Sequence, residues 1–292
     1  MENIIKKFKI SSNSRFDLKD HQTDYADGYT KENSGKILTD LIEKIADLQT
    51  ELYAANKNAL LIIFQAMDAA GKDSAIAHTM SGLNPQGCQV YSFKQPSIED
   101  LDHDFLWRHY KALPERGRIG IHNRSHYENV LVCKVHPEIV LGQRLPGIEN
   151  LKDIDNKFWE NRYESIRNFE KHLTLNGTTI IKFFLNVSED EQKERFLKRI
   201  AKPEKHWKFS SADIEERSYW KDYMNAYTKA INETATNDAP WYVIPADKKW
   251  FTHIAISTIM LQVLQDMKLK YPVLDKEEKD KLGEAAELLK GE

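Results

Sequence analysis

Apolar residues follow two kinds of pattern along the chain, and the two kinds alternate. Five short runs are almost entirely apolar, which is typical of strands buried on both faces of a parallel sheet. These predicted strands cover 59–65, 88–93, 118–122, 178–187 and 241–245. The stretches between them have apolar residues at spacings of three and four, which predicts helices. The predicted helices cover 33–55, 72–81, 99–111, 125–132, 155–175, 189–201, 211–232 and 248–268.

Strands that alternate with helices over this length predict an α/β fold. We expect a parallel five-stranded sheet flanked by helices on both faces, formed by residues 31–270. Residues 1–30 are polar and rich in turn formers, and we expect them to lie on the body as an N-terminal arm. Residues 271–292 are highly charged and predict a solvated helical tail. Neither a repeat nor a linker divides the chain further.

The predicted helix over 33–55 has one continuous apolar face. Such a face either packs on the sheet of its own domain or forms an interface with a second subunit. We favour packing within the domain, and a homo-oligomer stays an expectation.

Composition excludes several classes of protein. The chain has 292 residues, of which 30% are charged, and its net charge is only −3. This balance argues against a protein that binds nucleic acid through overall positive charge, although a local basic groove remains open. The longest apolar run, residues 59–64, is too short to cross a membrane, and the first residues contain no apolar run of the length that a signal peptide needs. Two distant cysteines fit a reducing compartment, so we expect a cytoplasmic protein.

The stretch "LLIIFQAMDAAGKDS" predicts a buried strand that leads into a phosphate-binding loop and a helix. In the usual P-loop (Walker A) pattern, a glycine opens the loop and a Ser or Thr follows the lysine, where its hydroxyl holds Mg²⁺. Here Ala66 replaces the glycine and Asp73 replaces the hydroxyl residue. Asp68 is the candidate Mg²⁺ ligand, because a hard carboxylate at the end of the strand can take that role. The predicted phosphate-binding residues of the loop are Ala69, Ala70, Gly71, Lys72, Asp73 and Ser74.

A second group of candidates follows the strand at 118–122, in the sequence "GRIGIHNRSHYENVLV". Asn123 stands where such folds carry a carboxylate, and Arg124 suits bidentate contact with a phosphoryl group. Glu128, four residues after Arg124, either contacts the metal or acts on the phosphate acceptor. By itself, a pair at this spacing is more often an ion pair on a helix surface, but its place beside a phosphate loop favours a catalytic role.

His122 and His126 are also four residues apart, which raises the alternative of a zinc site. Neither a third ligand nor an H-E-x-x-H pattern accompanies them. We therefore favour a role in supporting the site through polar contacts.

Taken together, these segments resemble the polyphosphate kinase 2 family over residues 15–270. The resemblance is carried by "FQAMDAAGKD", "SFKQPS", "HDFLWRHYKALP", "NRSHYENVLV" and "APWYVIPADKKWF". It implies a fold similar to thymidylate kinase, with a helical lid over a phosphate tunnel. It also implies Mg²⁺-dependent transfer of a phosphoryl group between inorganic polyphosphate and nucleotides, with Mn²⁺ as a substitute metal. Many members have Asp at position 123 and Asn at position 128, and the exchange here resembles the subgroup that accepts both nucleoside mono- and diphosphates.

The predicted lid, about 195–232, is rich in cations that could line a path for a polyanion. Arg195 and Arg199 lie on one helix face and are the preferred candidates, although a solvated face with its own acids is the alternative. The further candidates are Lys208 in the lid, Lys94 after the second strand and Arg108.

The predicted function is direct, in-line transfer of a phosphoryl group from polyphosphate to AMP and ADP, with guanine nucleotides as further acceptors. Lys72 and Arg124 would neutralise the transferred group, while Mg²⁺ on Asp68 would bridge the donor and acceptor oxygens. Two alternatives stay open: an ATP-dependent nucleoside monophosphate kinase and a non-catalytic module that binds polyphosphate or nucleotides. Chain-length preference, base preference and the direction of reaction in the cell do not follow from the sequence.

Overall fold

The computed structural model describes residues 2–12, 15–26, 28–208 and 210–291. Its sheet has the strand order β1-β6-β5-β2-β4-β3, and all neighbouring pairs are parallel except β1 with β6. The strands are β1 (Lys9–Ile10), β2 (Ala59–Gln65), β3 (Cys88–Ser92), β4 (Ile119–Asn123), β5 (Thr178–Asn186) and β6 (Trp241–Pro245).

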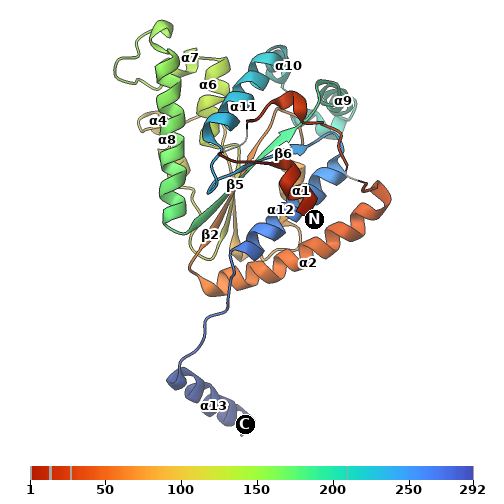
Figure 1. The fold of residues 1–292 in the computed structure, drawn as a ribbon, viewed down its shortest axis with the longest axis vertical. Coiled ribbons are helices and arrows are strands. Elements are labelled where there is room, and N and C mark those ends of the chain that lie inside the picture. The colour runs from red at the N-terminus through yellow and green to blue at the C-terminus, as the bar shows by residue number, and fades with distance from the viewer. Residues whose placement is uncertain (1, 13–14, 27, 209, 292) are drawn as a thin grey trace.

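Helices cover both faces of the sheet (Figure 1). On one face, α12 (Lys249–Asp266) packs against α1 (Glu2–Phe8), α2 (Lys31–Ala55) and α3 (Lys72–Met80). On the other face, α8 (Asn156–Leu175) packs against β5 and α11 (Trp220–Thr234). The remaining helices are α4 (Ile98–Leu101), α5 (Trp107–Tyr110), α6 (Val132–Val135), α7 (Glu138–Leu141), α9 (Glu189–Ile200), α10 (Ser211–Ser218) and α13 (Lys276–Lys290). Short 3₁₀ helices occur at η1 (Leu18–Asp20), η2 (Pro85–Gly87), η3 (His126–Val130), η4 (Leu151–Asp153) and η5 (Pro203–Lys208).

The central strand β2 positions the phosphate loop. Every residue of β2 is buried, because parallel neighbours flank it and helices cover both of its faces. Phe64, near its end, is paired with Asn123 on β4 and with Phe183 on β5. Because the carboxyl ends of these strands meet at one edge, the residues that follow β2 and β4 are brought together there.

The predicted five parallel strands are all present, but the sheet has six strands and is mixed. The short strand β1 pairs antiparallel with β6, with Ile10 opposite Trp241. Two residues are too short to produce a periodic pattern, so neither β1 nor the preceding helix α1 was predicted. Ile4, Phe8 and Ile10 are buried, so this part of the expected arm belongs to the core.

Three predicted helices are divided or altered. The predicted helix at 99–111 is two single turns, α4 and α5, and the segment at 125–132 is mainly the 3₁₀ helix η3. The predicted helix at 211–232 is interrupted at Tyr219, between α10 and α11. The apolar spacing gave no sign of these breaks, and α4 and α10 contain no buried residue.

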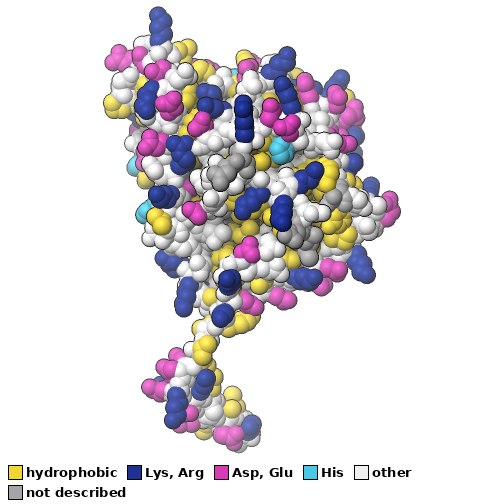
Figure 2. All heavy atoms as spheres, in the orientation of Figure 1, with side chains coloured by type: hydrophobic (Ala, Val, Ile, Leu, Met, Phe, Trp, Pro, Cys, Tyr) yellow, Lys and Arg dark blue, Asp and Glu magenta, His cyan; other side chains and the backbone are white. Residues whose placement is uncertain are grey.

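The apolar face of α2 packs within the chain, as favoured above. Leu41, Ile45 and Leu52 are buried, and α2 lies along α12. The tail helix α13 extends away from the body in Figure 1 and has no buried residue. On the face seen in Figure 2, basic and acidic side chains are intermixed, in keeping with the small net charge. Among the described residues, no helix combines the length and apolar character needed to cross a membrane.

Candidate active site

The phosphate loop joins β2 to α3 and has an unusual backbone. Ala69 and Gly71 have φ angles of 59° and 109°. A positive φ is uncommon for alanine and costs free energy, so contacts from outside the loop must hold it. Positive φ angles at alternate positions of a loop can turn successive N–H groups toward one anion. This part of the chain is therefore suited to binding phosphate.

Lys72 is the first residue of α3 and is buried beneath the loop. Its Nζ donates hydrogen bonds to the carbonyl oxygens of Ala66 (2.7 Å) and Met67 (3.3 Å). Burial lowers the pKa of Lys72, and the nearby Arg124 lowers it further, whereas three acidic side chains oppose the shift. An anion bound at the loop would stabilise the charged form of this lysine.

Arg124 joins the loop after β2 to the segment after β4. Its Nη2 donates to Asp68 Oδ1 at 2.7 Å, and its Nη1 lies 3.5 Å from Glu128 Oε2. Burial alone would lower the pKa of Arg124, but the carboxylates of Glu128 and Asp68 outweigh burial and raise it. Arg124 also has a φ of 64°, which, like that of Ala69, is a strained conformation found at many functional sites. The structure thus brings together the predicted catalytic residues Asp68, Arg124 and Glu128.

Asn123 holds the side chain of Asp73, the residue that replaces the usual hydroxyl residue of the loop. The amide Nδ2 of Asn123 donates to Asp73 Oδ1 at 2.9 Å and approaches Ser92 Oγ at 3.4 Å. The next loop residue, Ser74, turns the other way, with its Oγ 3.4 Å from Nε2 of His253 on α12.

The two favoured lid cations lie on α9 and have different surroundings. Arg195 is buried, and its guanidinium contacts the carbonyl oxygens of the phosphate loop rather than facing open space. Arg199 lies 3.3 Å from Asp213 of α10 and over the ring of Phe196. The side chain of Lys208 lies outside the described part of the structure.

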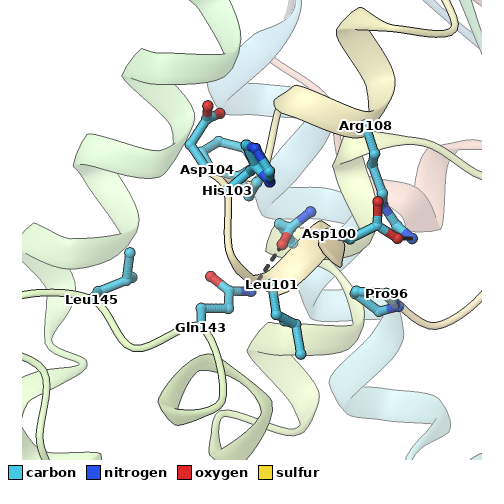
Figure 3. A pocket seen from close by; sticks show the side chains of 10 residues that line it. Pro96, Asp100, Leu101, His103, Asp104, Arg108, Gln143 and Leu145 are labelled. Carbon is cyan, nitrogen blue, oxygen red and sulfur yellow. Dashed lines mark hydrogen bonds and ion pairs between the residues drawn. The ribbon is translucent and has the colours of Figure 1, made fainter. Parts of the chain in front are cut away.

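Lys94, which follows β3, and Arg108, on α5, are in contact with each other. Nη1 of Arg108 donates to the carbonyl oxygen of Lys94 at 2.9 Å and lies 3.7 Å from Asp100. Arg108 and Asp100 help to line a small cavity, shown in Figure 3, in which Gln143 is hydrogen-bonded to Asn129. The cavity has a volume of about 30 Å³. A cavity of this volume has room for ordered water.

The two histidines considered as zinc ligands point in different directions. His122 Nε2 contacts the carbonyl oxygen of Ala112, whereas His126 Nε2 lies 3.5 Å from the buried carboxylate of Glu170. In the described ranges, no cluster of three or more His, Cys, Asp or Glu side chains has the arrangement of a metal site.

Comparison with known proteins places this geometry in a family. The model of the family "Polyphosphate kinase 2" matches residues 28–272 of the chain. The chain belongs to the polyphosphate kinase 2 family. An "ADP-polyphosphate phosphotransferase" of Rhodopseudomonas palustris is 51% identical over 91% of this chain and 92% of its own. An "AMP/ADP-polyphosphate phosphotransferase" of Meiothermus ruber is 40% identical over 92% of this chain and 96% of its own.

A solved structure agrees with this assignment. The crystal structure of polyphosphate kinase 2 from Arthrobacter aurescens superposes with a TM-score of 0.87 at 38% identity, covering 97% of this chain and 96% of that one. The expected α/β kinase fold of the polyphosphate kinase 2 family is thereby confirmed, with the additional edge strand as the difference.

Several residues near this kinase site were not singled out from the sequence. Gln192 donates to the carbonyl oxygen of Asp68 at 2.9 Å. Burial raises the pKa of Asp213, which pairs with Arg199, and the charge of Asp68 raises it further. Lys249, at the start of α12, lies close enough that a Cβ on Gly71 would contact its Cε at 3.8 Å. The available signal for Lys249 was its place at the start of the predicted helix that follows the last strand, in the sequence "PADKKW".

Proposed function

We propose that this protein transfers a phosphoryl group from inorganic polyphosphate to AMP and ADP. The observation that carries the proposal is the contact of Arg124 with both Asp68 and Glu128, beside a strained phosphate loop with a buried lysine. Membership of the polyphosphate kinase 2 family supports the choice of polyphosphate as donor. The names of the two relatives, one "ADP-" and one "AMP/ADP-", support nucleotide acceptors.

In this proposal the loop N–H groups hold the donor phosphates, and Lys72 and Arg124 balance the charge on the group being transferred. Phosphoryl transfer depends mainly on positioning and charge stabilisation, so direct in-line transfer needs no covalent enzyme intermediate. Arg124 can exchange one of its carboxylate partners for phosphoryl oxygens without leaving its place. Lys94, Arg108, Arg199 and Lys208 would bind more distant phosphates of the polyanion.

The carboxylates present fit Mg²⁺, and Mn²⁺ would bind to the same oxygen ligands. Mg²⁺ in phosphoryl-transfer sites is commonly held by one or two carboxylates, with substrate phosphates and water completing its shell. Asp68 Oδ1 accepts from Arg124, and the proposal assigns its second oxygen to the metal. When bound, the metal would supply positive charge to the phosphoryl oxygens.

The deciding experiment incubates the protein with AMP, Mg²⁺ and polyphosphate, with no ATP present. New ADP and ATP are the expected products. Phosphorylation of AMP by ATP but not by polyphosphate would instead indicate a nucleoside monophosphate kinase. Tight binding of polyphosphate without product would indicate a non-catalytic module. GMP and GDP in the same assay test whether guanine nucleotides are also acceptors.

A homo-oligomer is part of the proposal. The edge strand β3 has exposed Val90 and Tyr91 and is paired on one side only, which leaves an edge open to a second copy. Light scattering after size-exclusion chromatography measures the assembly, and a monomeric mass at working concentration would refute it.

A further inference from the structure

Two side chains of α9 contact the backbone of the phosphate loop from behind. Nε2 of Gln192 donates to the carbonyl oxygen of Asp68 at 2.9 Å. Nη1 of Arg195 donates to the carbonyl oxygens of Ala69 (3.1 Å) and Ala70 (2.5 Å). Gln192 and Arg195 are three residues apart and therefore share one helix face. Three consecutive carbonyl groups of the loop thus end on the same face of α9.

The hydrogen-bonding capacity of Arg195 is fully used in this arrangement. Its Nε donates to Glu191 at 2.7 Å, and its Nη2 donates to the carbonyl oxygens of Ala246 (2.6 Å) and Asp247 (3.1 Å). With the two bonds to the loop, all five N–H groups of the guanidinium have an acceptor. The side chain therefore joins α9, the phosphate loop and the end of β6, and has no donor left for a phosphate in this conformation.

Gln192 is held equally firmly, because both ends of its amide are bonded. The Oε1 atom accepts from Nη1 of Arg217 at 2.7 Å, while the Nε2 atom contacts the loop. The Gln192 residue itself is only 1% exposed. Since Arg217 belongs to α10, the chain of hydrogen bonds runs from the predicted lid through Gln192 to the loop.

These contacts decide which way the loop amides point. In a trans peptide the carbonyl group and the following N–H group point in opposite directions. Carbonyl groups held toward α9 therefore direct the N–H groups of Ala69, Ala70 and Gly71 away from α9. The N–H of Ala70 closes a turn to Met67 at 3.3 Å. No described group accepts from the N–H of Ala69 or Gly71, which leaves both for an anion.

We propose that Gln192 and Arg195 are positioning residues that hold the phosphate loop in its binding conformation. This inference rests on the proposed function and gives Arg195 a role other than the direct phosphate contact expected from the sequence. The positive φ of Ala69 disfavours the loop conformation by about 1–2 kcal/mol, so bonds from a rigid helix are needed to keep it populated. Gln192→Leu and Arg195→Lys keep the charge beside the loop but let the loop amides reorient.

The test uses Gln192→Leu and Arg195→Lys in the full-length chain, with initial rates measured against polyphosphate and AMP. Leucine keeps the volume of glutamine but cannot donate, and lysine keeps the charge of arginine but cannot reach four carbonyl groups. Glu194→Leu is the matched control, because Glu194 lies on the same helix, points to solvent and pairs only with Lys198 among the described residues. Thermal melting identifies any variant that fails to fold, in which case the other variant carries the test.

We expect kcat to fall at least about tenfold in both variants, since small displacements of positioned groups cost up to about 100-fold. The KM for polyphosphate should rise as well, because the loop amides that reorient also bind the donor phosphates, and Glu194→Leu should match the unmodified protein. If Arg195→Lys raises this KM while its kcat is kept, Arg195 binds the polyanion directly and the inference is overturned. An unchanged kcat in Gln192→Leu overturns it as well. If the unmodified protein makes no ADP from polyphosphate, the proposed function fails instead.

Discussion

Replacement of Asp68 by asparagine is the sharpest test of the proposed chemistry, because it removes one charge and almost nothing else. The amide oxygen of asparagine can still accept the 2.7 Å hydrogen bond from Arg124 Nη2. Arg124 also keeps its second partner, Glu128, at 3.5 Å. Asp68→Asn therefore separates the role of a negatively charged oxygen ligand from the role of a hydrogen-bond acceptor.

The structure sets the expected cost to stability at a small value. The side chains of Asp68 and Arg124 are 32% and 38% exposed, and ion pairs this accessible to solvent contribute about 0–1 kcal/mol. For a chain of this size, 1 kcal/mol lowers Tm by about 2–4 °C. The activity should fall much further. Removing one group that stabilises the transition state commonly costs about 100- to 1,000-fold in kcat.

The assay measures ADP formation from AMP and polyphosphate over a series of Mg²⁺ concentrations, beside a thermal melt of the same sample. Asp40→Asn is a suitable control, since Asp40 is an exposed acid on α2 far from the loop in sequence. We expect a large loss of kcat and a shift to higher Mg²⁺ requirement in Asp68→Asn, with Tm nearly unchanged. Activity within about threefold of the unmodified protein at the same Mg²⁺ concentration would refute the role of Asp68 as metal ligand.

Three further predictions follow from the same geometry. Glu128→Asn should shift acceptor preference toward ADP by about tenfold, because the carboxylate repels the second phosphate group of ADP. The ratio of kcat/KM for AMP to that for ADP measures the shift. An unchanged ratio removes Glu128 from the acceptor site. Gly71→Ala should lower stability by about 1–3 kcal/mol through its φ of 109° rather than by crowding, whereas Gly35→Ala in α2, where nothing lies within 4 Å, should not. Burial lowers the pKa of both His122 and His253 to about 4. Between pH 6.5 and 4 the unfolded chain therefore binds protons that the folded chain does not. The free energy of unfolding should fall as the pH drops through this range, by about 1.4 kcal/mol per pH unit for each histidine. His122→Gln should make this fall less steep, as measured by unfolding at several pH values.

The sequence predicted those features that depend on patterns local to one segment. The strand at 59–65 matches β2 residue for residue, and Lys72 is the first residue of the following helix, as the motif requires. The sequence also placed Asp68 and Arg124 in one site, and they meet there because both follow parallel strands whose ends lie at one edge. What made this possible is that adjacent parallel strands keep their register, so that Phe64 lies opposite Asn123.

The hydrogen-bond partners of individual charged residues could not be predicted in the same way. Arg195 was expected to face a polyanion because a cationic helix face beside a phosphate site suits one. Its acceptors are backbone carbonyl groups of the loop and of the end of β6, and a sequence contains no record of where carbonyl groups point. The short strand β1 was missed for a related reason, because its pairing with β6 depends on a segment more than 200 residues away.

Two of the departures of this chain from the usual pattern, at Asp73 and at Asn123, form one arrangement rather than two separate losses. Asp73 replaces the customary hydroxyl residue, and Asn123 replaces the expected carboxylate on the neighbouring strand. The structure joins them through a hydrogen bond of 2.9 Å in which only the amide can donate. With a carboxylate at position 123, two negative charges would meet at this distance unless a cation lay between them. The amide therefore holds Asp73 at the end of β4, and Asp68 is the carboxylate of the loop that contacts Arg124.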